Sequence, residues 1–355
     1  MLTDGVALTD HHCHGVVAAD LDRPGFERLL GEGRRGTFDS SIGLAVRRWC
    51  APVLDLEPHA DPERYLARRA ELGWREATTR LLRAAGTTRW FLDTGFGGAR
   101  AEFAALAPGE VCEIVRLEQV AEQVITEVGS AKRPFEDVET ALRGRARNAV
   151  GLKTIVAYRC GLDFPRTDTP PSTITHELRL TDPATLGWLV GLGARIGAEF
   201  GLPLQFHTGF GDPDLRLHSA DPLLLTDFLH TTAGSGLSVM LLHCWPFHRN
   251  AAYLTHVFDH VHLDLGLTIP YVGRRAEAVL AEALELAPFR AMLYSSDGCG
   301  LPELHYLGAL LWRHGLGRLL DEWIADDAIT LVDAERLVSA IANGNAARTY
   351  ALSGN

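Results

Sequence analysis

The chain has 355 residues, of which 46% are hydrophobic and 22% are charged, and it contains 35 glycines and 17 prolines. This composition is typical of a globular protein and excludes disordered, collagen-like and low-complexity chains. The 34 basic and 45 acidic side chains give a formal net charge of −11, which disfavours nucleic acids and anionic membranes as partners.

The cellular location is predicted from what the sequence lacks. The first fifteen residues contain neither a basic segment nor a long apolar one, and no stretch approaches the roughly 18 apolar residues of a membrane span. The six cysteines lie far apart and form no Cys-x-x-Cys pair, as expected of reduced thiols. We therefore expect a cytoplasmic protein without structural disulfides.

Short apolar runs rich in β-branched residues alternate with longer helical patterns along the chain. This alternation is typical of βα units around a parallel sheet. Eight strands are predicted, at Val6–His14, Thr88–Asp93, Val111–Leu117, Val150–Tyr158, Pro203–Thr208, Leu237–His243, Val261–Leu265 and Ala291–Ser296. Helical segments are predicted at Pro62–Ala85, Glu136–Arg147, Asp182–Phe200, Pro222–Thr232, Arg249–Asp259, Arg274–Leu286 and Leu304–Leu320.

Eight βα units predict an α/β fold, a closed (β/α)8 TIM barrel that forms a single domain over residues 1–355. Two segments, Val16–Asp61 and Leu162–Leu180, follow the first and fourth strands and are too long for ordinary βα loops. We expect these insertions to extend over the C-terminal face of the barrel as a lid and substrate walls. The tail Thr330–Leu352 predicts an extra C-terminal helix.

Side chains that bind metals stand near the ends of most predicted strands. The carboxyl ends of all barrel strands meet at one mouth, so residues far apart in sequence become neighbours there. The two-residue period of a strand puts His12 and His14 on one face, together with Asp10 as a supporting partner. The predicted ligands are His12, His14, Lys153, His207, His243 and Asp297.

The chemistry of these ligands indicates the metal. Imidazole and carboxylate groups without a thiolate motif suit Zn²⁺ first, with Mn²⁺, Fe²⁺ or Co²⁺ as substitutes. A bound metal lowers the pKa of water, and Asp297 could take up that proton and return it to a leaving group. Cys13 and Cys244 should point away from the site, because they alternate with the histidines, and we expect them to be buried fillers.

Five segments resemble the amidohydrolase superfamily: TDHHCHG, QFHTGFGD, LLHCWPF, LYSSDG and the terminal IANGNAARTYAL. The resemblance runs from Asp10 to Leu352 and is strongest to the amidohydrolase-related branch that includes the N-terminal domain of glutamine-synthetase-fused proteins of fungi and plants. It implies a (β/α)8 barrel in which His12, His14, His207 and Asp297 bind metal. In one-metal members the sixth-strand histidine, here His243, acts near the substrate; in two-metal members it binds the second ion, and a carboxylated lysine bridges the pair.

Lys153 is one of only two lysines among the 34 basic residues, so it stands where arginine would not serve. GLKTIVAYR resembles the fourth strand of hydantoinase-like members, which favours a metal-bridging Lys153; a substrate contact and a structural ion pair are the alternatives. Arg159, on the same predicted strand face, is expected to bind a substrate carboxylate or else to form a salt bridge. Weaker candidates for the pocket wall are Tyr158, Asp212 and Trp245.

Three functions follow from this site. The first is a metal-dependent hydrolase that cleaves an amide C–N bond of a small, carboxylate-bearing substrate, with His243 assisting and Asp297 moving the proton. The second is a metal-dependent decarboxylase of an aromatic or related small acid, in which Arg159 orients the carboxylate. A non-catalytic ligand-binding barrel is disfavoured by the complete ligand set. The expected partner is a small-molecule substrate with one or two metal ions, and a homo-oligomer is compatible with the sequence.

Overall fold

The computed structural model describes residues 1–33, 37–95, 100–128, 134–171 and 179–352. The chain forms two compact units, each assembled from separate segments. Unit 1 combines Met1–Cys112, Leu265–Glu285 and Met292–Ala346, and unit 2 combines Glu113–Asp264, Leu286–Ala291 and Ala347–Asn355. Within the described ranges, no helix has both the length and the apolar composition to cross a membrane. The single domain over 1–355 stays a prediction.

Unit 1 is built around two parallel strands, β1 (Leu8–Cys13) and β2 (Thr87–Asp93). Every residue of β1 is buried, so this strand has no solvent-exposed polar face and no regular alternation of polar and apolar residues. The pairing is irregular between Asp10 and Cys13, where three steps along β1 match two along β2. Such an extra residue bends a strand and redirects its side chains, and here it falls at the first predicted ligand, His12.

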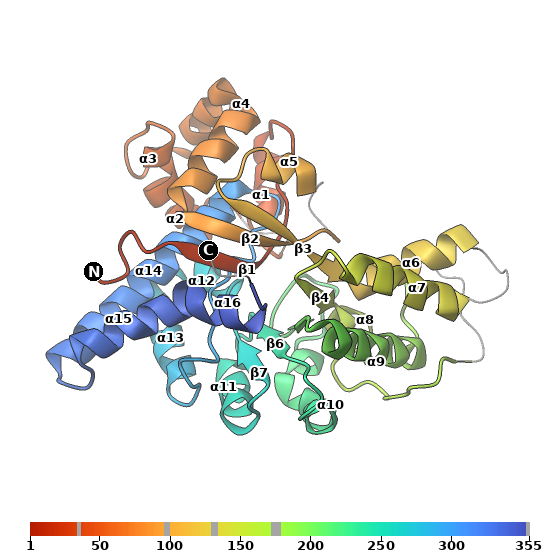
Figure 1. Ribbon diagram of the computed structural model, residues 1–355. Helices are drawn as coiled ribbons and strands as arrows, with labels where there is room; N and C mark the ends of the chain where they lie inside the picture. Colours follow the sequence, from red (N-terminus) through yellow and green to blue (C-terminus); the bar gives the residue numbers. More distant parts are fainter. Residues whose placement is uncertain (34–36, 96–99, 129–133, 172–178, 353–355) are drawn as a thin grey trace. The chain divides into compact units, whose positions relative to one another are not determined.

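Helices surround this strand pair (Figure 1). The longest are α4 (Pro62–Ala84) and α14 (Pro302–Ala325), which pack on each other. Helix α4 begins where the Asp61 carboxylate accepts a hydrogen bond from the Glu63 amide and Pro62 occupies the first turn. The other helices of unit 1 are α1 (Arg23–Leu29), α2 (Ser41–Ala45), α3 (Ala51–Val53), α5 (Arg100–Ala104), α12 (Thr268–Val272), α13 (Ala276–Leu284) and α15 (Leu331–Ser339).

The first predicted insertion is therefore helical. It contains α1, α2, α3 and a π-helical turn at Val46–Cys50. The turn contacts α4 and α14, and α2 contacts α12. The second insertion overlaps residues 172–178, which lie outside the described residues.

Unit 2 carries parallel strands that are hydrogen-bonded in chain order. They are β3 (Glu110–Arg116), β4 (Gly151–Thr154), β5 (Leu204–His207), β6 (Val239–Leu242) and β7 (Val261–Leu263). The helices between them are α6 (Leu117–Val128), α7 (Pro134–Ala146), α8 (Val156–Arg159), α9 (Pro183–Phe200), α10 (Thr226–Thr232) and α11 (His248–Val257). Helix α9 is capped by the Asp182 carboxylate and ends at Gly201, whose φ of 68° suits glycine.

Two predicted strands differ from the structure. The fourth ends at Thr154, because the Thr154 hydroxyl accepts a hydrogen bond from the Val156 amide and turns the chain into α8. The eighth is an extended segment without a continuous ladder. In unit 1 it runs beside β1, where His11 N donates to Tyr294 O and Asp297 N donates to His12 O.

The C-terminal segment is helical, as predicted, but it is not one continuous α-helix. Helix α15 is followed by a π-helical turn at Ala340–Gly344 and then by α16 (Asn345–Thr349). The Asn345 side chain within this segment donates to the carbonyl oxygen of Met292 at 2.5 Å, which ties the tail to the extended segment. Helix α6 is not among the predicted helical segments, and the predicted third strand included its first residue, Leu117.

Candidate metal centre

In unit 1, His12 and His14 share one carboxylate partner. Nε2 of His12 lies 3.0 Å from Oδ1 of Asp297, and Nε2 of His14 lies 3.4 Å from the same oxygen. The two rings are nearly perpendicular, with centroids 5.1 Å apart. The side chains are 0%, 10% and 10% exposed, in the order His12, His14 and Asp297. The predicted convergence of these three residues is therefore present within this unit.

Backbone hydrogen bonds hold Asp297 against β1. Asp297 N donates to His12 O at 3.1 Å, and His14 N donates to Gly298 O at 2.8 Å. Asp297 itself has a φ of 50°, a conformation that costs a non-glycine residue free energy and persists where the surroundings impose it. A Cβ at position 298 would collide with the His305 ring, so glycine is required beside the carboxylate.

A second carboxylate of unit 1, Asp93, belongs to the same group of side chains. Ligand atoms of His12, His14 and Asp93 all lie within 4.8 Å of one another. Nδ1 of His14 is 3.3 Å from the Asp93 carbonyl oxygen, and Asp93 Oδ1 accepts a hydrogen bond from Gly95 N at 2.9 Å. Asp93 is the last residue of the predicted second strand and was not among the predicted ligands, although its place at a strand end matches that of the histidines.

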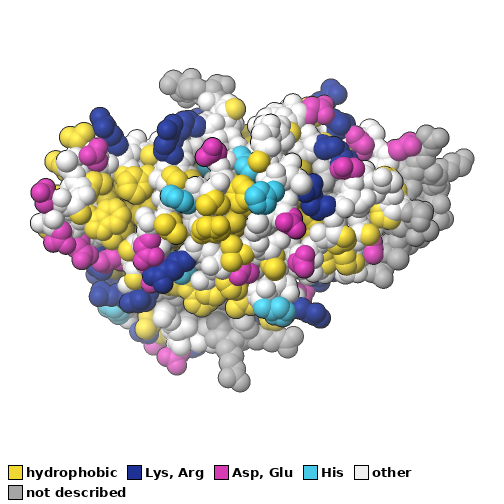
Figure 2. Space-filling view, turned by 90° about the horizontal axis from the view of Figure 1, so that it is seen from below, with side chains coloured by type: hydrophobic (Ala, Val, Ile, Leu, Met, Phe, Trp, Pro, Cys, Tyr) yellow, Lys and Arg dark blue, Asp and Glu magenta, His cyan; other side chains and the backbone are white. Residues whose placement is uncertain are grey.

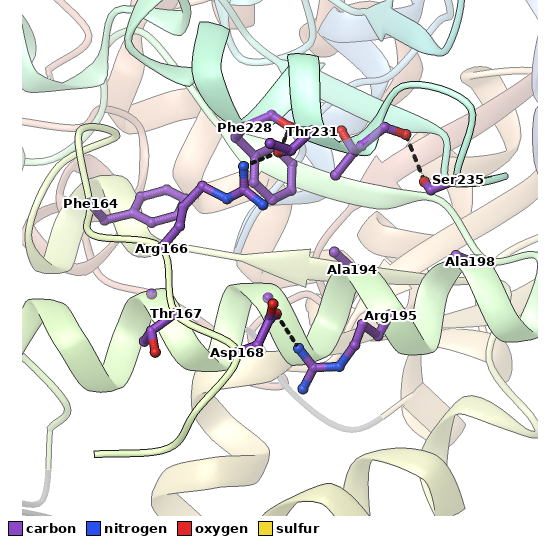
Figure 3. A pocket seen from close by; sticks show the side chains of 13 residues that line it. Phe164, Arg166, Thr167, Asp168, Ala194, Arg195, Ala198, Phe228, Thr231 and Ser235 are labelled. Carbon is purple, nitrogen blue, oxygen red and sulfur yellow. Dashed lines mark hydrogen bonds and ion pairs between the residues drawn. The ribbon is translucent and has the colours of Figure 1, made fainter.

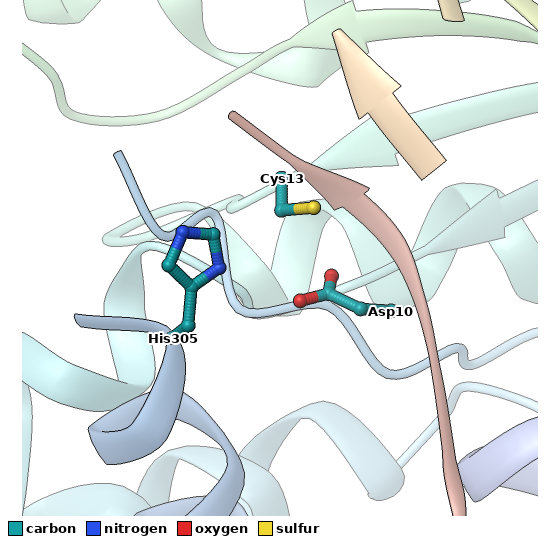
Figure 4. A group of neighbouring side chains, drawn as sticks. All are labelled: Asp10, Cys13 and His305. Carbon is teal, nitrogen blue, oxygen red and sulfur yellow. The ribbon is translucent and has the colours of Figure 1, made fainter. Parts of the chain in front are cut away.

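A buried layer adjoins this group (Figure 4), formed by Asp10, Cys13 and His305. Asp10 accepts hydrogen bonds from Ser296 N at 3.0 Å and from Ser296 Oγ at 2.5 Å, and Ser296 Oγ lies 3.4 Å from His305 Nδ1. Burial raises the pKa of Asp10 to about 8 and lowers the pKa of His305 to about 3. These hydrogen bonds tie β1 to the segment that carries Asp297, and Asp10 groups with Cys13 and His305 and not with His12 and His14 as the two-residue period predicted.

The cysteine in this layer behaves as a buried filler. Cys13 is fully buried, and its thiol donates to the carbonyl oxygen of Phe91 at 3.6 Å. Burial raises the pKa of this thiol well above its ordinary value, which favours the neutral form over a thiolate ligand. The thiol of Cys244 is equally buried and donates to Leu241 O.

In unit 2, the His207 ring contacts two other aromatic side chains. His207 ends β5, and its ring centroid is 4.7 Å from that of His243 and 4.5 Å from that of Tyr158. Nε2 of His207 lies 3.2 Å from the carbonyl oxygen of Phe210. A Cβ at Gly211 would collide with the Tyr158 hydroxyl, so glycine is needed for Tyr158 to lie against His207. The structure thus brings Tyr158 together with two of the predicted ligands.

Asp264 orients His243. His243 N donates to Asp264 Oδ1 at 3.0 Å, and His243 Nδ1 lies 3.9 Å from the same oxygen. The φ of His243 is 69°, so this residue, like Asp297, holds a conformation that the surrounding structure must impose. Asp264 directly follows β7 and is fully buried. Asp264 was not among the predicted site residues, although it lies near the end of a predicted strand.

Lys153 is 2% exposed and faces the same side of the sheet as His207. The hydroxyl of Thr154 donates to Glu118 of α6, and Phe206 packs on Phe228 of α10, so these neighbours face the helices. Alternation therefore turns Lys153 and His207 to the opposite face. Lys153 pairs with Gln205 in the ladder, two residues before His207 and so roughly 7 Å deeper along the strand.

The remaining candidates have other partners. Arg159 lies on α8 instead of a strand face shared with Lys153, so that part of its prediction was wrong, and its Nη2 lies 3.0 Å from Oε1 of Glu122. Burial lowers the pKa of Arg159. Asp212 is exposed, and its carboxylate accepts from Asp214 N at 2.9 Å in a turn. Trp245 is exposed, and its ring lies 5.5 Å from that of Phe210.

Comparisons with known proteins agree with these motifs. The model of a family described as amidohydrolase matches residues 193–352. Protein FluG of Emericella nidulans is 29% identical over 278 residues, which cover 67% of this chain and 32% of FluG. The chain thus spans about a third of the length of this relative.

Solved structures extend the comparison to nearly the whole chain. A protein of Lactobacillus casei, named as a candidate metal-dependent hydrolase, has a TM-score of 0.85 and 27% identity, with 98% of this chain and 96% of that chain covered. Uronate isomerase of Thermotoga maritima has a TM-score of 0.64 and 12% identity, with the same coverage, and so shares the fold. These likenesses support a TIM-barrel-like α/β fold, while closure by an eighth regular strand stays a prediction. The chain is therefore similar to the amidohydrolase-related superfamily, a group of metal-dependent enzymes, and to FluG, and these matches support its assignment to that superfamily.

Proposed function

We propose that the chain is a metal-dependent hydrolase that cleaves an amide C–N bond of a small, carboxylate-bearing substrate. The observation that carries this proposal is the convergence of His12 and His14 on one oxygen of Asp297, in a buried position. Two imidazoles and a carboxylate are the donor set of catalytic zinc sites, and Mn²⁺, Fe²⁺ and Co²⁺ accept the same donors. The residues present therefore fit a divalent metal.

The remaining predicted ligands belong to unit 2. His207 ends β5, His243 follows β6, and Lys153 lies on β4 with its side chain on the same face as His207. What supports their assignment as ligands is this placement on successive strands, together with the similarity to the superfamily. Asp93, whose carboxylate groups with His12 and His14, is the added candidate from the structure.

The chemistry of the proposed centre follows from its donors. A divalent metal polarises a carbonyl oxygen and lowers the pKa of water. Asp297 accepts a proton from the attacking water and delivers it to the amide nitrogen as the C–N bond breaks. His243 would bind a metal ion through Nε2, because Asp264 lies on the Nδ1 side of its ring. Tyr158, beside His207, forms part of the substrate wall.

We assign Lys153 as a carboxylated, metal-bridging residue in a two-metal centre. Carboxylation requires a neutral amine, and burial in the interior favours the neutral form over the ammonium. Lys153 is 2% exposed, and this burial supports the assignment. Arginine cannot replace a carboxylated lysine. This explains why a lysine occurs at position 153 in a chain whose basic residues are otherwise almost all arginine.

The partner of Arg159 bears on both the hydrolase and the decarboxylase interpretation. The decarboxylase interpretation needs Arg159 to orient the carboxylate that is lost as CO₂. Arg159 is instead largely buried and paired with Glu122 at 3.0 Å. The proposal therefore assigns Arg159 a supporting role in unit 2, and the substrate carboxylate a different partner.

Metal analysis and a paired activity screen test the proposal. We expect the purified protein to contain a divalent metal, to carry the mass of one CO₂ on Lys153 before denaturation, and to release amine from a panel of small carboxylate-bearing amides. His12→Ala should lose metal while its circular dichroism is unchanged, and the exposed histidine of α11 provides the control, His256→Ala. Full metal occupancy in His12→Ala would refute the site; CO₂ release from aromatic acids without amide cleavage would refute the hydrolase.

A further inference from the structure

A separate cavity in unit 1 has the composition of an anion-binding site. It encloses about 480 Å³ and is lined by residues of the first insertion, of the turn before α13 and of the middle of α14. None of the candidate metal ligands lines it. Its volume lies within the range of pockets that bind small organic molecules.

The charge of this cavity is strongly one-sided. Its lining includes one acidic side chain, Glu277, and four arginines, Arg48, Arg274, Arg275 and Arg318. Among the residues that the structure describes, no carboxylate forms an ion pair with any of these four. Other arginines of the same unit form ion pairs, as Arg64, Arg68 and Arg80 of α4 do. A chain with a net charge of −11 thus leaves four guanidinium groups uncompensated at one pocket.

A cavity of about 300 Å³ in unit 2 shows the opposite arrangement (Figure 3). There Arg195 Nη1 lies 2.9 Å from Asp168 Oδ1, and Arg166 donates a hydrogen bond to the Thr231 hydroxyl. Its guanidinium groups therefore already have partners within the protein. Figure 2 shows that basic and acidic side chains are likewise interspersed over the face it draws. The clustering of four arginines that form no ion pair with the described residues thus distinguishes the unit 1 cavity from the unit 2 cavity.

Trp49 gives the unit 1 cavity a flat, apolar wall. The Arg48 guanidinium lies 4.2 Å from the centre of the Trp49 ring, and the His314 ring centroid is 5.0 Å away at an interplanar angle of 73°. Burial, followed by the charges of Arg318 and Arg48, lowers the pKa of His314 and favours its neutral form. Leu44, an exposed large apolar side chain, also lines the cavity.

We propose that this cavity binds a small organic polyanion of the nucleoside phosphate class, with its phosphates on the four arginines and its flat ring against the wall formed by Trp49. Guanidinium groups match phosphate oxygens with two parallel hydrogen bonds, which an ammonium group does not. Aromatic side chains stack on nucleobases because every base has a π face. The volume holds a molecule of this size, and the apolar wall distinguishes it from inorganic phosphate.

Calorimetric titration of the full chain tests the proposal, with ATP, tripolyphosphate, adenosine and citrate as probes. We expect ATP to bind more tightly than tripolyphosphate or citrate, adenosine to bind weakly, and the ATP affinity to fall as salt is added. Arg48→Gln with Arg318→Gln should weaken ATP binding by about tenfold or more, because each removes a charged hydrogen bond. Trp49→Leu should weaken ATP binding and leave tripolyphosphate unaffected.

Matched variants locate the effect. The control, Arg64→Gln with Arg80→Gln, removes the same charge from paired arginines of α4 and should leave the ATP affinity unchanged. An equal loss in both double variants would overturn the proposal, as would absence of ATP binding at millimolar concentration or citrate binding as tightly as ATP. Asp297→Asn should bind ATP like the wild type; a loss there with Arg48 and Arg318 intact would place the ligand at the metal centre and overturn the separate site.

Discussion

Replacing Glu303 by glutamine tests the buried ion pair that joins α4 to α14. Glu303 Oε1 accepts hydrogen bonds from Arg69 Nε at 2.9 Å and from the Tyr65 hydroxyl at 2.9 Å. The Glu303 and Arg69 side chains are 0% and 3% exposed. Glutamine keeps the shape and one acceptor oxygen, but it leaves the Arg69 charge without its counter-charge in the interior.

The expected cost follows from this burial. Removing one partner of a buried, hydrogen-bonded pair destabilises a protein by about 3–5 kcal/mol. Urea unfolding, followed by circular dichroism at pH 7, should show a lower midpoint with an unchanged slope. The control is Glu63→Gln, which breaks the exposed pair with Arg23; its effect should be much smaller because water screens both charges.

Two outcomes would refute the reasoning. The first is a loss of unfolding free energy for Glu303→Gln that is no larger than the loss for Glu63→Gln. This would show that water screens the pair of Arg69 and Glu303. The second concerns the double variant Arg69→Met with Glu303→Leu, which removes both charges. It should be more stable than Glu303→Gln alone, since an apolar replacement leaves no unpaired charge. A double variant that is less stable would show that shape, and not charge, decides the effect.

Three further predictions concern the candidate site and its support. Asp264→Asn keeps the acceptor for the His243 amide but loses the charge, so kcat/KM should fall by about 10–100-fold with the melting temperature unchanged; full activity would contradict its orienting role. Because burial lowers the pKa of His305 to about 3, its contribution to stability is complete above the ordinary value near 6.5 and is lost as the pH falls. The wild type should therefore lose about 2 kcal/mol more than His305→Phe between pH 7 and pH 5 in urea unfolding, and parallel losses would contradict the assignment. Gly211→Ala should push Tyr158 away from His207 and lower kcat/KM by up to about 100-fold in a folded protein, whereas an unchanged kcat/KM would show that Tyr158 does not position the substrate.

The two histidines of the first strand were predictable from sequence because their relation is local. A spacing of two residues puts both side chains on one face of any strand, and the structure has them converge on Asp297. The irregular pairing of β1 lies between Asp10 and Cys13, and His12 and His14 still approach the same oxygen of Asp297. Asp297 was selected for its place at a strand end, although the segment before it proved to be extended chain without a regular ladder.

Arg159 shows where the same reasoning failed. The apolar run from Val150 to Tyr158 reads as one strand, and even spacing then puts Arg159 on the face of Lys153. In the structure, the side chain of Thr154 bonds to the Val156 amide and to Glu118, so the strand ends four residues earlier. Hydroxyl side chains that bond to nearby backbone compete with strand pairing, and periodicity does not register that competition.

The sequence by itself determined the alternation of strands and helices, the candidate donors near the strand ends and the resemblance to the amidohydrolase-related superfamily. Each of these depends on residue type and on spacing along a few neighbouring positions. Only the tertiary structure decided which groups support those donors: Asp264 for His243, the layer of Asp10, Ser296 and His305 for β1, and Glu122 for Arg159. These partners come from distant segments that packing brings into hydrogen-bond distance, and no local pattern encodes which segments will meet.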